Sequence, residues 1–104
     1  MNEFRYQIPE GIFLNKSESS GLLNLAQQEM KEGALAFGVF GGRTLYGKND
    51  IDIIVVKERI QRSGLTLRNG IFHLNYFPTN FLSDPIATFG KQAFNSAVFI
   101  YNYL

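Results

Sequence analysis

The strongest constraint on the fold of this chain is an uninterrupted apolar run, Ala34 to Phe40. A run of this length predicts a buried β-strand, because a buried helix needs a longer apolar segment. Gly41 and Gly42 end the run, and a polar loop follows them. The loop leads into Asp50 to Val56, whose Ile and Val residues predict a second strand. The centre of the chain is therefore expected to be two buried strands joined by a glycine loop.

Helical periodicity precedes the first strand. The apolar residues at helical spacing are Leu22, Leu23, Ala26 and Met30. The serines at 17, 19 and 20 are candidate N-caps, and Gly33 is of the type that often follows the last helical turn. This pattern predicts an amphipathic helix over about Ser20 to Glu32.

Turn signals divide the rest of the chain. Asn69-Gly70, between the strand candidates Leu65–Arg68 and Ile71–Phe77, predicts a β-hairpin. Asp84-Pro85 predicts an N-cap and the first residue of a further helix. Near the N-terminus, Gly11 to Leu14 predicts a short strand.

Length and composition limit the number of domains and the kinds of site. A chain of 104 residues can bury one core and is too short for two domains of ordinary size. We therefore expect one α+β domain over residues 1–104, with a small mixed β-sheet packed against helices. The chain has no cysteine, which excludes disulfides, thiolate zinc sites and cysteine nucleophiles.

The N-terminal sequence and the lengths of the apolar segments indicate where in the cell the protein is expected. The first residues lack the basic and apolar segments of a secretory signal, and no apolar window is long enough to span a bilayer. These features predict a cytoplasmic protein without a membrane partner.

The charge distribution is uneven although the net charge is only +1. So small a charge gives no support to a non-specific nucleic-acid binder held by a basic surface. Residues 43–91 carry seven bases and four acids, whereas residues 1–33 carry three bases and five acids. The basic excess thus surrounds Asp50 and Asp52, where an anionic substrate would need it. For any single Lys or Arg, the alternative is an ordinary solvated face.

The C-terminal segment carries no side-chain charge from Gln92 to Leu104. So apolar a segment must be buried, either as a helix or final strand within the domain or in a subunit interface. A homo-oligomer or a partner protein contacting this segment is one alternative, and a cut from a longer chain is another.

Asp50 and Asp52 carry the chemistry that the sequence suggests. Side chains alternate along a strand, so both carboxylates should share one face while Ile51, Ile53 and Val55 enter a core. Two adjacent carboxylates repel each other. A protein tolerates such a pair if it is exposed, if one of the two is protonated or if a cation neutralises both. Oxygen ligands of this kind suit Mg²⁺ or Mn²⁺.

The glycine loop offers a place for a phosphate. Gly41 and Gly42 lack Cβ atoms, so their backbone can turn sharply and bring N–H groups close to a ligand. Arg43 and Lys48 could neutralise further phosphate charge, and Tyr46 could stack on a base. The alternative is an ordinary loop between strands, with solvent-exposed aspartates.

The segment Phe40 to Val56, FGGRTLYGKNDIDIIVV, resembles the signature of the DNA polymerase β-like nucleotidyltransferase superfamily, especially its minimal members. That signature is a hydrophobic residue, two glycines or glycine and serine, a loop, and two aspartates that alternate with hydrophobic residues. Here Phe40, Gly41, Gly42, Asp50, Ile51, Asp52 and Ile53 fill those places. The resemblance is strongest over about Leu22 to Val56.

The resemblance implies transfer of a nucleoside monophosphate from a nucleoside triphosphate to a hydroxyl. Asp50 and Asp52 would be the catalytic and metal-holding residues, and the glycine pair would hold the triphosphate, with most catalysis coming from positioning and charge neutralisation. The family's third carboxylate comes from a later strand, here Ile71 to Phe77, which contains no acid. His73 and Asn75 share a face of that strand and are the candidates for the third position. For His73, the only histidine, the alternative is a structural role.

Three hypotheses for the function follow. The chain binds a nucleoside triphosphate with Mg²⁺ and transfers a nucleotide; or it is a degenerate member of the same fold that acts as a binding or regulatory module; or it is a small oligomeric interaction protein without a nucleotide site. Fold likeness cannot choose among them, because function depends on the site.

Overall fold

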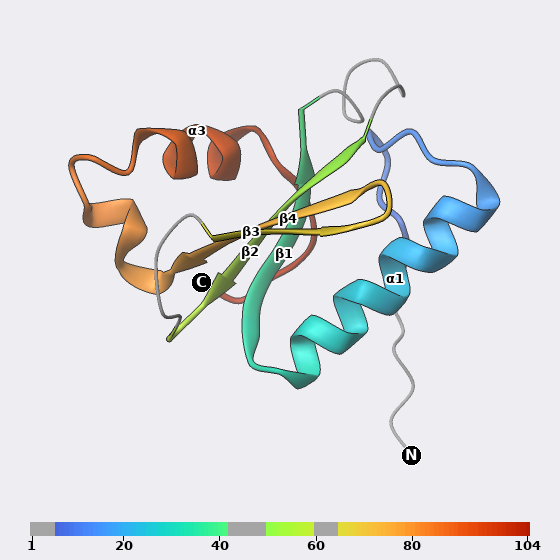
Figure 1. The fold of residues 1–104 in the computed structure, drawn as a ribbon, viewed down its shortest axis with the longest axis horizontal. Coiled ribbons are helices and arrows are strands. Elements are labelled where there is room, and N and C mark those ends of the chain that lie inside the picture. The colour runs from blue at the N-terminus through green and yellow to red at the C-terminus, as the bar shows by residue number, and fades with distance from the viewer. Residues whose placement is uncertain (1–5, 42–49, 60–64) are drawn as a thin grey trace.

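The computed structural model describes residues 6–41, 50–59 and 65–104, and it is an α+β structure built on one five-stranded mixed sheet. Figure 1 shows α1 and α3 on different sides of the strands. In chain order the elements are α1 (Lys16–Lys31), β1 (Ala34–Phe40), β2 (Ile51–Lys57), β3 (Leu65–Asn69), β4 (Phe72–Pro78), the 3₁₀ helix η1 (Thr79–Ser83), α3 (Thr88–Ser96) and β5 (Val98–Asn102). The predicted α+β class, with a small mixed sheet packed against helices, is confirmed.

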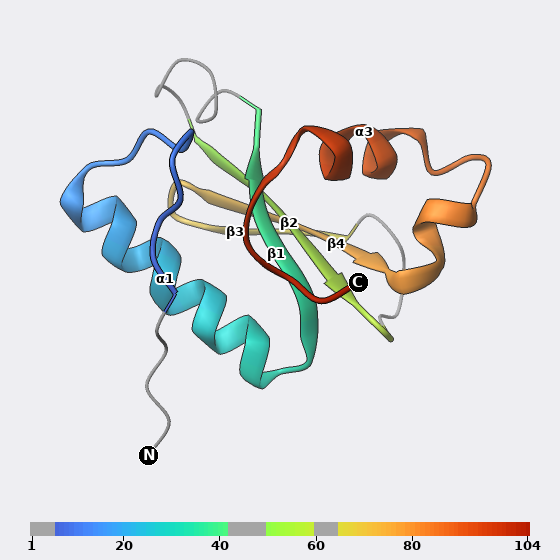
Figure 2. The ribbon, with the colours of Figure 1, turned by 180° about the vertical axis from the view of Figure 1, so that it is seen from behind.

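The order of the strands across the sheet is β3-β4-β2-β1-β5. The central pair, β2 and β4, is parallel, and the other three neighbouring pairs are antiparallel. Each face of the sheet carries its own core. Figures 1 and 2 show the strands crossing between α1 and α3. Ile51, Ile53 and Val55 enter the core beneath α1, whereas Ile54 and Val56 enter the core beneath α3. The predicted alternation along β2 is confirmed.

The first helix begins four residues before the predicted start. Asn15 is its N-cap: the Asn15 side chain accepts from the Glu18 N–H at 2.8 Å, and the Glu18 side chain accepts from the Asn15 N–H at 3.1 Å. This reciprocal capping box satisfies two backbone donors at the helix start. The serines at 17, 19 and 20 therefore lie inside the helix and not at its cap. After the last turn, Gly33 takes a φ of +96°, which suits glycine.

The hairpin is present, with its loop one residue later than predicted. Asn69 still pairs with Phe72, so the loop consists of Gly70, with a φ of +61°, and Ile71. Arg68 consequently lies opposite His73. A loop formed by Asn69-Gly70 would have placed Arg68 opposite Ile71.

Two of the predicted elements are wrong. Residues 11–15 form a turn and an extended segment that does not join the sheet, so the strand predicted over Gly11 to Leu14 is absent. Asp84 does not cap a helix: its side chain accepts from the Ile86 N–H at 3.0 Å and closes a local turn, and α3 begins only at Thr88. An Asp side chain can hydrogen-bond to the backbone in a turn or at the start of a helix, and here it does so in a turn.

The C-terminal segment from Gln92 forms the end of α3 and a final strand within the domain, as one of the alternatives predicted, but Tyr103 and Leu104 are 58% and 49% exposed and so are not buried as expected. β5 pairs antiparallel with β1, and Ile100 and Tyr101 are buried there. Among the described residues no helix is long and apolar enough to cross a membrane.

Helix α3 is held against the sheet by Gly90. A Cβ at this position would lie 2.8 Å from Phe77 Cε1 and 3.0 Å from Phe81 Cδ2. Glycine to alanine normally stabilises a helix interior, but here the added methyl overlaps two packed rings. We expect Gly90→Ala to lower the free energy of unfolding by about 1–3 kcal/mol in urea denaturation. Gln92→Ala, at an exposed position of the same helix, should change it by less than about 0.5 kcal/mol; a stable Gly90→Ala protein would contradict this packing.

Candidate functional site

Asp52 and Gly41 meet on the face of the sheet that α3 partly covers. Asp52 lies in β2 opposite Phe40, the last residue of β1, and Gly41 follows directly. A Cβ built on Gly41 would be 3.1 Å from Asp52 Oδ2, and Gly41 has a φ of +77°. Both the close approach and the positive φ favour glycine here. The end of the first strand thus lies close to a carboxylate of the predicted pair.

Asp50 precedes β2 by one residue and projects toward the same neighbours as Asp52. His73 lies opposite Asp52 in the parallel pair β2–β4. Its Nε2 is 3.2 Å from Asp50 Oδ2, and its Nδ1 is 3.7 Å from Asp52 Oδ1. The structure therefore brings Asp50, Asp52 and His73 together, and a protonated imidazole in this position would neutralise part of the carboxylate charge.

The Nε2 atom of His73 is buried without a hydrogen bond, the one such side-chain nitrogen or oxygen among the described residues. It is near Asp50 Oδ2 in distance, but the two groups are not aligned for hydrogen bonding. An unsatisfied buried nitrogen beside a carboxylate is a position at which a ligand can supply the missing partner.

Arg68 is a site residue that the sequence interpretation missed. From β3 its guanidinium donates to Asp50 Oδ2 at 3.0 Å and to the Gly70 carbonyl at 3.2 Å. The side chain is 65% exposed, so the ion pair with Asp50 is a weak one that a bound anion or cation can disrupt. The signal that could have revealed Arg68 is the hairpin register, which sets it opposite His73.

Asn75 belongs to the framework beneath the site. Its amide donates to the Ile53 carbonyl at 3.0 Å and to the His73 carbonyl at 3.3 Å, and the residue is buried. In the register of β2 and β4 it lies opposite Ile54, two positions beyond Asp52. Of the two predicted third-position residues, His73 is therefore the one beside the aspartates, and Asn75 fixes the backbone of both strands.

No family model matches this chain, and no curated protein matches it in sequence.

The Asp52 carboxyl has a raised pKa. Burial is the main cause, the negative charge of Asp50 adds to it, and His73 acts in the opposite direction. Because the folded chain holds this proton more tightly than the unfolded chain, Asp52 favours folding most below its ordinary pKa. That contribution is lost as the pH rises through the raised pKa. The ionised form of Asp52 is thus the form that folding disfavours, and a cation bound to it would relieve that cost.

The remaining predicted substrate-binding residues, Gly42, Arg43 and Lys48, lie outside the described residues, as does Tyr46. Within the part of the chain that the structure describes, no group of three His, Cys, Asp or Glu side chains is arranged to hold a metal ion. Two carboxylates with oxygen atoms facing one imidazole are, however, donors that fit Mg²⁺ or Mn²⁺ when substrate oxygens and water complete the shell. Asp50 and Asp52 would be the residues that hold such an ion.

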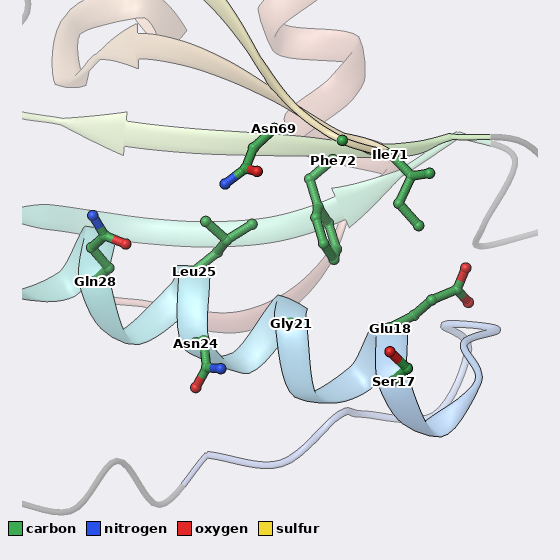
Figure 3. A pocket seen from close by; sticks show the side chains of 10 residues that line it. Ser17, Glu18, Gly21, Asn24, Leu25, Gln28, Asn69, Ile71 and Phe72 are labelled. Carbon is green, nitrogen blue, oxygen red and sulfur yellow. The ribbon is translucent and has the colours of Figure 1, made fainter.

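A hollow in the described part of the chain lies away from these carboxylates. It has a volume of about 540 Å³ and lies between α1 and the β3–β4 hairpin. Figure 3 shows Phe72 and Ile71 pointing from the hairpin toward Gly21 and Leu25 of the helix. Phe72 and Leu25 pack against the core beneath α1, so this hollow is on the opposite face from Asp52. The side chains of Asp50 and Asp52 are 41% and 39% exposed.

Proposed function

We propose that this chain binds a nucleoside triphosphate together with Mg²⁺ or Mn²⁺ in the manner of a nucleotidyltransferase fold. Asp50 and Asp52 would hold the cation, and the turn at Gly41 and Gly42 would hold the polyphosphate. The observation that carries this proposal is the close approach of Gly41, where a side chain would meet the Asp52 carboxylate, at the ends of two paired strands. A cation on Asp52 would lie next to phosphate oxygens bound at the glycine turn.

The charged groups of the site also favour a triphosphate bound together with a metal ion. Burial, with the charge of Asp50, raises the pKa of Asp52 and so disfavours its ionised form, which a bound divalent cation would stabilise. Arg68 already lies at Asp50 and is exposed, so it can turn to a phosphate once a metal occupies the carboxylates. A metal-bound triphosphate provides both the cation and the anion that these groups need.

The identity of the third residue favours a binding or regulatory role over efficient catalysis. His73 lies beside the aspartates on the neighbouring strand, where the resemblance implies a third carboxylate. A neutral imidazole brings one negative charge fewer to a cation cage than a carboxylate. We therefore expect nucleotide affinity with weak or absent transfer of a nucleoside monophosphate to a hydroxyl acceptor.

Thermal unfolding with ATP, GTP, CTP and UTP, each with and without Mg²⁺, tests this function. A ligand that binds only the folded chain raises the melting temperature. At a concentration of 100 times its Kd it adds about 2.7 kcal/mol to the free energy of unfolding. We expect a rise that requires both nucleotide and Mg²⁺, and we expect Asp52→Asn to abolish it.

The matched control is Glu58→Gln, which removes one negative charge from an exposed residue just after the far end of β2. This variant should keep the full response. Pyrophosphate release with candidate acceptors then separates an enzyme from a binding module. If the native chain gives no response to any nucleotide and its mass by light scattering rises with concentration, the function is that of an oligomeric interaction protein.

A further inference from the structure

An aromatic ring is left open to solvent next to the carboxylate site. Phe89, in the first turn of α3, is 56% exposed. Its ring lies 5.9 Å from the ring of Phe40 in an edge-on arrangement and 6.2 Å from the ring of Phe77. Such contacts fix the orientation of a ring and still leave one of its sides accessible.

Phe40 connects this ring to the aspartates. It is the cross-strand partner of Asp52, and it packs against the core beneath α3. Phe89 therefore packs against the residue that lies directly across the strand pair from Asp52. His73 approaches the carboxylates from β4, on the other side of β2. Asp52 therefore has the Phe40 side chain on one side and the His73 imidazole on the other.

We infer that Phe89 is the stacking platform for the base of the bound nucleotide, a role that rests on the triphosphate site proposed above. With the polyphosphate at Gly41 and the cation at Asp52, the base extends past Phe40 to the open side of the Phe89 ring. Stacking on phenylalanine uses the π-face that every base has, so this contact binds purines and pyrimidines without reading their edges. Phe40 and Phe77 hold the ring in place.

The test compares ATP with inorganic tripolyphosphate, each with Mg²⁺, by titration calorimetry. Tripolyphosphate contacts the cation site and the glycine turn but has no base. We expect Phe89→Ala to weaken ATP binding by about tenfold or more, since base–aromatic stacking has that magnitude. The affinity for tripolyphosphate should stay unchanged. Phe89→Tyr, which keeps an aromatic face, should restore ATP binding.

Ile86→Ala is the matched control, because Ile86 is an apolar residue of the same region and is 86% exposed. It should leave both affinities as they are. ATP binding that survives Phe89→Ala without loss would overturn the stacking role and leave the triphosphate site intact. Failure of the native chain to bind either ATP or tripolyphosphate would overturn both, and an equal loss for the two ligands in Phe89→Ala would show that the ring supports the fold and not the base.

Discussion

His73→Asp is expected to raise the affinity for Mg²⁺ by about tenfold or more, because the affinity of oxygen-ligand sites follows their carboxylate count. His73 lies opposite Asp52, and its nitrogens reach both aspartates, so an acid at this position would join them in one cluster. Without metal the same change should lower the melting temperature, since three neighbouring carboxylates repel one another. Melting curves over a range of Mg²⁺ concentrations measure both effects.

His73→Asn is the control for this change. It also removes the imidazole, but it adds no charge, so its Mg²⁺ affinity should not rise. An equal gain in the Asp and Asn variants would mean that loss of the histidine alone opens the site. If neither variant gains Mg²⁺ affinity, the placement of residue 73 at the third metal-ligand position is contradicted.

Lys57→Met is expected to destabilise the fold by about 3 kcal/mol, because it leaves the buried carboxylate of Glu29 without its cation. Lys57 Nζ lies 3.4 Å from Glu29 Oε1, and the two side chains are only 17% and 6% exposed. Tyr76 donates its hydroxyl to Glu29 Oε1 at 2.8 Å, but a hydroxyl cannot replace a full positive charge. Urea denaturation of the native and variant chains gives the difference in the free energy of unfolding.

Two further variants show whether this loss of stability comes from the unpaired charge of Glu29. Lys57→Met with Glu29→Gln removes both charges and keeps an acceptor for Tyr76, so most of the stability should return. Lys31→Met changes an exposed lysine near the end of α1 and should cost less than about 0.5 kcal/mol. If the single and double variants at Lys57 are equally unstable, the loss arises from packing of the lysine stem and not from the unpaired charge.

The strands that carry the site could be predicted because their signals are local. The apolar runs before Gly41 and after Asp50 have the length and composition of buried strands, and side-chain alternation along β2 separates Asp52 from Ile51 and Ile53. The sharing of one site by both aspartates and His73 followed from the same alternation, once the later strand was taken as a neighbour of β2.

The parts that could not be predicted depend on contacts distant in sequence or on competing local hydrogen bonds. Arg68 reaches Asp50 only because the hairpin loop lies at Gly70 and Ile71, a register that the Asn69-Gly70 signal does not give. Asn15 caps α1 in a capping box with Glu18. The serines at 17, 19 and 20 are also good N-cap residues, and for that reason the predicted start of the helix was too late. The closeness of Phe89 to Phe40 depends on how α3 packs on the sheet, which periodicity does not describe.

The most direct test of the proposed site is line broadening by Mn²⁺ in the amide spectrum of the isotope-labelled chain, recorded with a nucleoside triphosphate present. Mn²⁺ broadens the signals of nearby nuclei, so the affected amides locate the ion. We expect the strongest broadening at Gly41, Asp50, Asp52 and His73, and its loss in Asp52→Asn. Broadening centred on the hollow between α1 and the hairpin, at Gly21 and Gln28, would instead place the metal on the opposite face and contradict the proposed site.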